Sequence, residues 1–408
     1  MFEAAVLCLV ITALAAYVNH RVFGLPITIG VMVVSLLFSL TLLVLDRLGS
    51  NLMREFESRT LGEIDFSALL LNGMLSVLLF AGALQVDLSR LRSYRWQVGV
   101  LAIGGTLLST VVIGIGLHAL LPLAGLSLGF GYCLLFGALI SPTDPIAVIS
   151  ILKSAGVSSE VNMVISGESL FNDGIGVVLF TLLIAFATTG ISPTGAEIAT
   201  MLWRDVGGGL VLGALLGGAL FVLLRSINNY KVEVLLTLAA VLGGYELARR
   251  LHVSGPLAMV VAGVIIGNHG RSLAMSDTTR HHVDLFWELL DDILNAVLFV
   301  LIGLEVIVVE FPARVIVAAT GAIVLALLAR LLAAGVPVLA FRSWFRLPPK
   351  AWRTLTWAGL RGGISVALAL SLKPGPEREL ILALTYAVVV FSILVQGLTL
   401  RRLVQRWQ

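Results

Sequence analysis

The chain has 408 residues, of which 58% are hydrophobic and only 12% are charged. Soluble domains carry about 25% charged residues, so this composition argues against a cytoplasmic enzyme or a nucleic-acid-binding protein. The net charge of +3 is small, and in a membrane protein it indicates orientation rather than binding to a polyanion. Cys8 and Cys133 lie in apolar runs, which indicates neither a disulfide framework nor a cysteine metal site.

The apolar runs have the length of membrane-spanning helices. Because such a helix needs about 20 apolar residues, the chain is predicted to be an all-α polytopic membrane protein with about 13 transmembrane helices. In chain order the runs cover about residues 3–18, 25–45, 67–85, 98–122, 130–152, 161–188, 205–224, 232–248, 256–268, 285–309, 314–341, 352–372 and 379–400.

The Lys and Arg residues indicate the orientation of these runs. If the N-terminus lies outside, most of the basic residues fall in inside links, and Arg330 and Arg361 fall within spans. The positive-inside rule therefore predicts an external N-terminus and a cytoplasmic C-terminus.

Two of the runs are interrupted. The fifth contains Ser-Pro-Thr-Asp-Pro at residues 141–145, and the twelfth contains Gly-Leu-Arg-Gly-Gly at residues 359–363. Prolines and glycines break helices, and irregular backbone at membrane depth survives only when it is buried in protein or lines a cavity. Broken helices at corresponding positions of two halves indicate a transporter binding site and inverted repeats. The expected division is residues 1–188, a linking helix in 189–228, and residues 229–408.

Polar and acidic residues gather around the first break. In the sixth run, helical spacing places Ser169 and Asp173 on one face, with Asn172 beside them. These are hard oxygen donors, which suit a small cation. Asp144 can add a second carboxylate from the broken run, and Thr143 a carbonyl freed from helical bonding. A lone Ser or Asn in a membrane helix is more often a contact between helices than a ligand.

Glu168 and Arg361 are two further charged residues within the predicted spans. A lone buried guanidinium is very costly, so the two residues are expected to form a buried structural ion pair with each other.

Three motifs carry a resemblance to a known family. They are the Ser-Pro-Thr-Asp-Pro segment, Gly-Glu-Ser-Leu-Phe-Asn-Asp-Gly at residues 167–174, and Trp-Ala-Gly-Leu-Arg-Gly-Gly at residues 357–363. In this order they resemble the monovalent cation/proton antiporters of the NhaP type, which are relatives of the animal sodium/proton exchangers. One departure is Ala81, where many relatives carry a glutamate.

The resemblance implies a role for each matching residue. It implies cation and proton binding by Asp173, Asp144, Ser169, Asn172 and Thr143, with Na⁺ held by all of these except Asn172, and a core-stabilising pair of Glu168 and Arg361. It also implies a homodimer without a cofactor, in which a core of helices 4–6 and 11–13 moves against a dimerisation domain.

The expected function is secondary antiport of Na⁺ or Li⁺ against H⁺, with cation and proton competing for Asp173. Because Asn172 stands next to Asp173, where electrogenic relatives carry a second aspartate, electroneutral one-to-one exchange is expected. The expected setting is pH and sodium homeostasis at the plasma membrane of a prokaryote. The alternatives are a K⁺/H⁺ antiporter, a proton-coupled solute carrier, a channel, or an intramembrane aspartyl protease. The protease is disfavoured because Gly174 and Gly176 follow the aspartate instead of preceding it.

Overall fold

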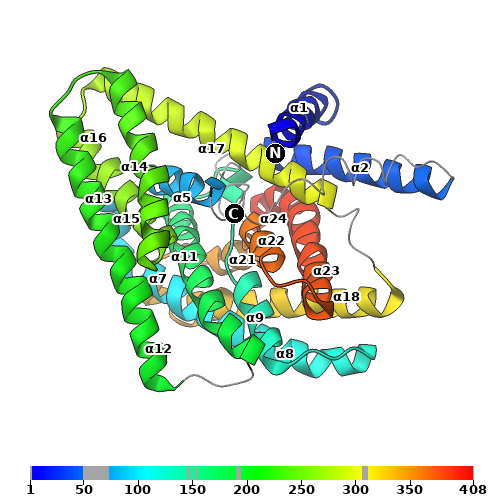
Figure 1. Ribbon diagram of the computed structural model, residues 1–408. Helices are drawn as coiled ribbons and strands as arrows, with labels where there is room; N and C mark the ends of the chain where they lie inside the picture. Colours follow the sequence, from blue (N-terminus) through cyan, green and yellow to red (C-terminus); the bar gives the residue numbers. More distant parts are fainter. Residues whose placement is uncertain are drawn as a thin grey trace.

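The computed structural model describes residues 2–48, 73–144, 148–149, 151–152, 155–189, 194–305 and 311–407. These residues form helices joined by turns and short loops, with no β-strand among them, so the expected all-α fold is confirmed (Figure 1). The helices of the first part are α1 (Phe2–Val18), α2 (Ile27–Arg47), α5 (Leu75–Leu84), α6 (Leu88–Ser93), α7 (Arg95–Gly99), α8 (Thr106–Leu120), α9 (Phe130–Ile140) and α11 (Ser159–Thr189).

The second part of the chain contains the remaining helices. They are α12 (Gly195–Leu202), α13 (Gly208–Arg225), α14 (Tyr230–Leu251), α15 (Gly255–Ile265), α16 (Arg271–Leu273), α17 (Asp277–Glu305), α18 (Ala313–Arg330), α19 (Val336–Ala340), α20 (Arg342–Phe345), α21 (Ala351–Trp357), α22 (Gly363–Leu370), α23 (Pro376–Phe391) and α24 (Leu398–Trp407). π-Helical turns join α7 to α8, α12 to α13, α18 to α19, and α23 to α24 into longer helices.

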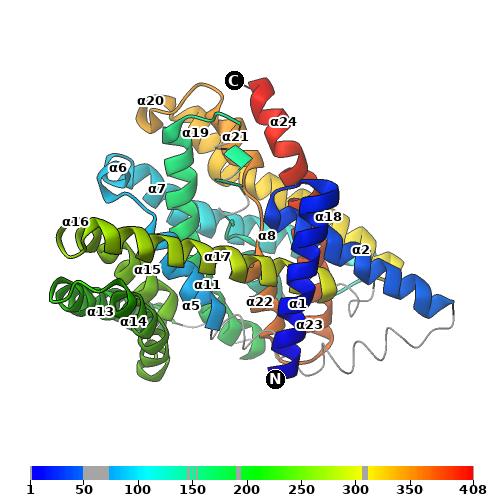
Figure 2. The same cartoon turned by 90° about the horizontal axis from the view of Figure 1, so that it is seen from above.

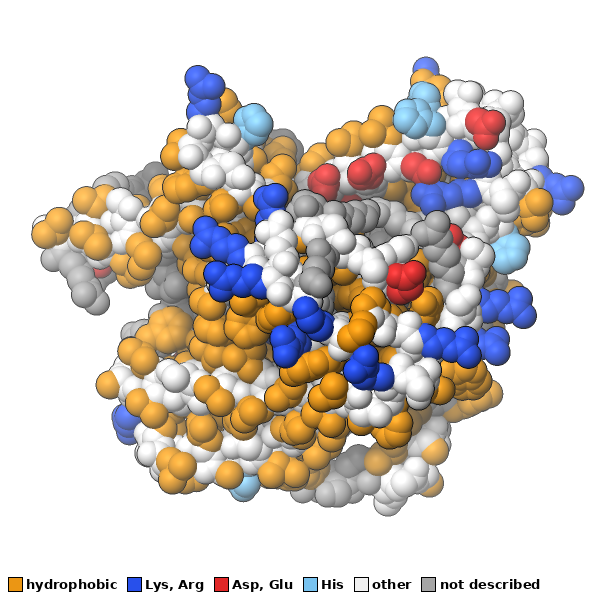
Figure 3. All heavy atoms as spheres, turned by 180° about the vertical axis from the view of Figure 1, so that it is seen from behind, with side chains coloured by type: hydrophobic (Ala, Val, Ile, Leu, Met, Phe, Trp, Pro, Cys, Tyr) orange, Lys and Arg blue, Asp and Glu red, His pale blue; other side chains and the backbone are white. Residues whose placement is uncertain are grey.

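The long apolar runs explain why helices form. Within a bilayer each backbone N–H and C=O must find a partner inside the protein, and a helix satisfies them within one segment. Seven helices of the described part are long and apolar enough to cross a membrane. Hydrophobic side chains cover much of the face in Figure 3, and Lys and Arg side chains gather in its middle. The number of about thirteen spans remains a prediction.

Local sequence also sets where some helices begin. Thr194 caps α12, because its hydroxyl accepts a hydrogen bond from the N–H of Glu197 at 3.3 Å. The Glu197 carboxylate in turn accepts from the N–H of Thr194 at 2.7 Å, which completes a capping box. At α15, the Ser254 hydroxyl accepts from the N–H of Leu257, and a proline lies in the first turn.

The described helices pack around two buried apolar clusters. One cluster draws on α1, α2, α8, α9, α11, α17, α18 and α21–α24, and the other mainly on α5, α13–α15 and α17. Figures 1 and 2 both show α13, α14 and α15 together on one side of the molecule, away from α18, α22 and α23. Helix α17 packs against α5 and α14 along one part and against α1, α2 and α22 along another, so it contributes to both clusters.

Candidate functional site

The two predicted helix breaks are present, and they lie against each other. Helix α9 ends at Ile140 and residues 142–144 are extended, while residues 359–362 separate α21 from α22. The N–H of Asp144 donates to the carbonyl of Leu360 at 2.8 Å. A Cβ on Gly362 would lie 2.6 Å from the Cβ of Asp144, so only glycine permits this approach. The breaks therefore bring Asp144 against the start of α22.

Arg361 holds the end of α9. Its guanidinium is 2% exposed and donates through Nη1 to the carbonyl oxygens of Ser141 and, at 3.0 Å, Pro142. The backbone N–H of Arg361 donates to the Ser392 hydroxyl at 2.9 Å. Carbonyls at a helix C-terminus lack intrahelical partners and carry the negative end of the helix dipole. The guanidinium thus satisfies backbone oxygens that the Pro142 break leaves open.

The expected ion pair between Glu168 and Arg361 is wrong, because Glu168 pairs with Arg330 on α18. Both carboxylate oxygens of Glu168 accept from Arg330, with the Nη2–Oε2 distance at 2.9 Å. The Nε of Arg330 also donates to the carbonyl of Leu355 at 3.1 Å. The physical reason is competition between two buried arginines: Arg361 is occupied by the carbonyls at the end of α9, which leaves Arg330 to face the carboxylate.

Thr143, Ser169 and Asn172 are brought together as a hydrogen-bonded cluster. The Thr143 hydroxyl lies 3.1 Å from that of Ser169 and accepts from Nδ2 of Asn172 at 2.9 Å. The N–H of Thr143 donates to Oδ1 of Asn172 at 3.3 Å. All three residues are buried, so the amide of Asn172 fixes the extended segment onto α11. Their role as cation ligands remains a prediction.

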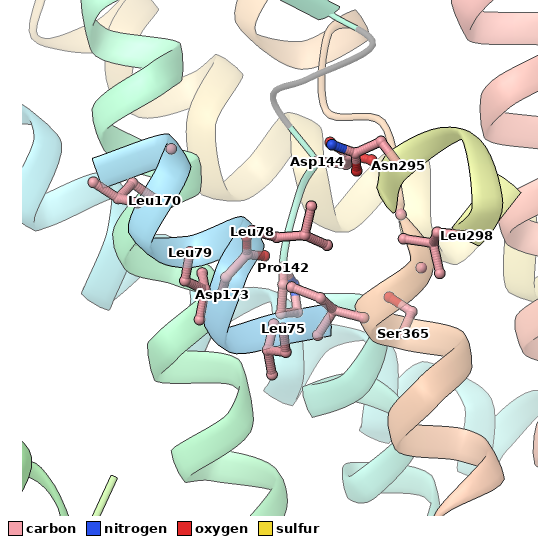
Figure 4. A pocket seen from close by; sticks show the side chains of 14 residues that line it. Leu75, Leu78, Leu79, Pro142, Asp144, Leu170, Asp173, Asn295, Leu298 and Ser365 are labelled. Carbon is pink, nitrogen blue, oxygen red and sulfur yellow. The ribbon is translucent and has the colours of Figure 1, made fainter. Parts of the chain in front are cut away.

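Asp173 projects from α11 into a cavity of about 70 Å³ (Figure 4). The cavity is lined by α5, α11, α17, α22 and the extended segment, and Asp144 lies on its wall. The Asp173 side chain is 8% exposed, and no donor among the described residues hydrogen-bonds its carboxylate. An isolated buried carboxylate is costly, so this geometry favours a bound proton or a bound cation at Asp173.

Glycine explains how the extended segment packs on α11 beside Asp173. A Cβ on Gly176 would overlap the ring of Pro142, which lines the same cavity. Gly176 is therefore a packing position for the broken helix.

Two cavity-lining polar residues escaped the sequence analysis, Asn295 on α17 and Ser365 on α22. The signal available for Asn295 was its spacing of four residues from Asp291 on one helix face, and in the structure its Nδ2 donates to Oδ1 of Asp291 at 3.1 Å. On α5, Ala81 is buried, and its neighbours Leu78 and Leu79 line the cavity. The α5 wall of the cavity is accordingly apolar.

Comparison with known proteins identifies the family. Residues 9–406 match the family described as sodium/hydrogen exchanger, transmembrane. The chain belongs to the sodium/hydrogen exchanger family. The resemblance seen in the three motifs is thus confirmed, and the family is one of transporters.

Individual relatives of this exchanger match along most of their length. It is 51% identical over 410 residues to the Na⁺/H⁺ antiporter NhaP of Pseudomonas aeruginosa, covering 100% of this chain and 97% of that protein. It is 37% identical over 347 residues to the Na⁺/H⁺ antiporter NhaH of Halobacillus dabanensis, covering 84% and 83% of the two chains. The solved structure of the sodium proton antiporter MjNhaP1 of Methanocaldococcus jannaschii has the same fold, with a TM-score of 0.74 at 19% identity over 99% and 98% of the chains.

Proposed function

We propose that this exchanger is a secondary active antiporter that moves Na⁺ or Li⁺ in one direction and H⁺ in the other. The observation that carries the proposal is the carboxylate of Asp173, which is buried, faces the cavity and accepts no hydrogen bond from the described residues. The names of the relatives, Na⁺/H⁺ antiporters at 51% and 37% identity, support the choice of ions.

Exchange follows from competition for one carboxylate. A proton or a small cation neutralises Asp173, whereas the empty, charged form is penalised by its apolar surroundings. Only the loaded forms then cross between the two sides, which couples the two gradients by alternating access. In the proposed Na⁺-bound form, the ligands are Asp173, Asp144, the hydroxyl of Ser169 and Thr143. Asn172 holds Thr143 in place through the two hydrogen bonds between them.

The proposal extends to assembly and orientation. The protein acts as a homodimer in the plasma membrane of a prokaryote, with an external N-terminus and a cytoplasmic C-terminus, and contributes to pH and sodium homeostasis. A core of α8, α9, α11, α18 and α21–α23 moves against the remaining helices. The separate apolar cluster of α5 and α13–α15 supports placing these four helices outside the core.

The test uses the purified protein in proteoliposomes with an internal pH dye, challenged in turn with Na⁺, Li⁺ and K⁺. Wild type is expected to move protons in response to Na⁺ and Li⁺. Asp173→Asn is expected to reduce the response to background while leaving a folded protein, because an amide carries neither the negative charge that attracts the cation nor a titratable proton. The matched control is Asp277→Asn at the exposed start of α17, which is expected to behave as wild type.

Two results would contradict the proposal. If Asp173→Asn still shows substantial cation-induced proton movement, Asp173 is not the binding residue. If the wild-type protein responds to K⁺ alone, the transported cation is K⁺ and not Na⁺ or Li⁺.

A further inference from the structure

One side of the cavity is formed by α17, which contributes polar groups that the exchange mechanism above does not use. Asn295 is 1% exposed and lines the cavity, as does Asp144. Figure 4 shows the two side chains at the same end of the cavity. One turn earlier on α17 lies Asp291, which is 8% exposed.

Asp291 and Asn295 are joined by hydrogen bonds. Nδ2 of Asn295 donates to Oδ1 of Asp291 at 3.1 Å and to its backbone carbonyl at 2.8 Å. The amide therefore turns its nitrogen toward Asp291. This arrangement connects the Asp291 carboxylate to the cavity through a single side chain.

The charge on Asp291 has no counter-charge in the described part of the chain. No Lys, Arg or His among those residues forms an ion pair with it, and Arg361 is held by the carbonyls of Ser141 and Pro142. The charged groups that act on Asp291 are themselves acidic: Asp292 on the same helix and Asp144 from the extended segment. A buried carboxylate among acids is costly unless it holds a proton or a cation.

A purely structural role does not require this charge. A hydrogen bond to Asn295 within one helix turn is equally available from an asparagine or serine, neither of which carries a desolvation cost of this size. The cavity that Asn295 lines also contains the nine-tenths buried carboxylate of Asp173, which no described residue hydrogen-bonds, so a second acidic group in that cavity also favours a bound proton or cation.

We propose that Asp291 is a further cation-binding carboxylate of the transport path, placed on α17 one turn before Asn295, which lines the cavity. It holds a small monovalent cation next to Asn295 and Asp144 before the ion reaches Asp173. The proposal rests on the exchange function proposed above. The cation-binding carboxylates then come from two different helices. Asp291 lies on α17, which packs on α2, α5 and α14, whereas Asp173 lies on α11.

The experiment measures the Na⁺ concentration that gives half-maximal proton movement in proteoliposomes at fixed pH. At an effective dielectric constant of about 20, the loss of one unit charge that attracts a nearby cation changes its affinity by roughly tenfold. Asp291→Asn is therefore expected to raise the half-maximal Na⁺ concentration roughly tenfold, with a smaller change in the maximal rate. Asp277→Asn is the matched control, because it removes the same charge from the 98% exposed start of the same helix and is expected to keep the wild-type value.

Two further variants separate charge from structure. Asp291→Glu keeps the charge and is expected to restore the half-maximal concentration to within about threefold of wild type. If Asp291→Asn does not yield folded protein, Asp291→Ser keeps an acceptor for Asn295 and gives the same readout. Na⁺-dependent thermal stabilisation of the purified protein provides the affinity without turnover, since a ligand of the native state raises its stability.

The outcomes distinguish this proposal from the exchange function. An unchanged half-maximal Na⁺ concentration in a folded neutral variant overturns the role of Asp291, while Asp173→Asn still reports on exchange itself. If Asp291→Glu raises the half-maximal Na⁺ concentration as much as Asp291→Asn does, the role of Asp291 is also overturned, because the shape of the side chain and not its charge would then matter.

Discussion

Removing Arg330 is expected to be one of the most destabilising single changes in the protein. The side chains of Arg330 and Glu168 are 7% and 2% exposed, and both carboxylate oxygens are engaged by the guanidinium. Breaking such a pair from one side leaves an uncompensated buried charge, which costs about 3–5 kcal/mol. Loss of the bond to the Leu355 carbonyl adds about 1 kcal/mol. Arg330→Ala should therefore lower the melting temperature by about 5 °C or more.

The assay is thermal unfolding of the purified protein in a mild detergent, with a double-mutant cycle. Arg330→Ala leaves the Glu168 carboxylate buried without a counter-charge, and Glu168→Gln removes that charge. The double variant should therefore melt at a higher temperature than Arg330→Ala alone. Arg249→Ala is the control: its ion pair with Glu246 is exposed at 62% and 41% of the two side chains, and no measurable change is expected.

The reasoning is refuted if Arg330→Ala melts like wild type, or if Glu168→Gln makes Arg330→Ala less stable. In either case the buried pair does not hold the α11–α18 contact together.

Two further predictions follow from the crossing of the helix breaks and from the residues beside Asp173. Gly362→Ala should reduce transport at least tenfold while the protein remains folded, because the added Cβ would lie 2.6 Å from Asp144. The control is Gly243→Ala, whose added Cβ meets nothing within 4 Å. Normal transport by Gly362→Ala would contradict the close packing of the two helix breaks. Exchange should be electroneutral, because the amide of Asn172 carries no proton beside Asp173, so the rate at fixed gradients should not respond to a potassium–valinomycin potential. A clear response means that a second proton moves, with Asp144 as the first residue to test.

Much of the fold was predictable from local sequence. Apolar runs must become helices in a bilayer because backbone groups have no other partners there, and the helices of the described part follow those runs. The breaks were predictable as well, since proline and glycine act on their own segment. The cluster of Ser169 and Asn172 near Asp173 follows from helical spacing alone, which needs no knowledge of neighbouring helices.

Tertiary structure decided which distant groups meet. The sequence places Glu168, Arg330 and Arg361 within spans, but the rotation and approach of α11, α18 and the second break determine that Arg330 takes the carboxylate. The same applies to α17, where nothing in the local pattern orients Asn295 toward the cavity of Asp173. Helix rotations are set by side-chain packing summed over many contacts, so a single segment does not contain the information that selects these partners.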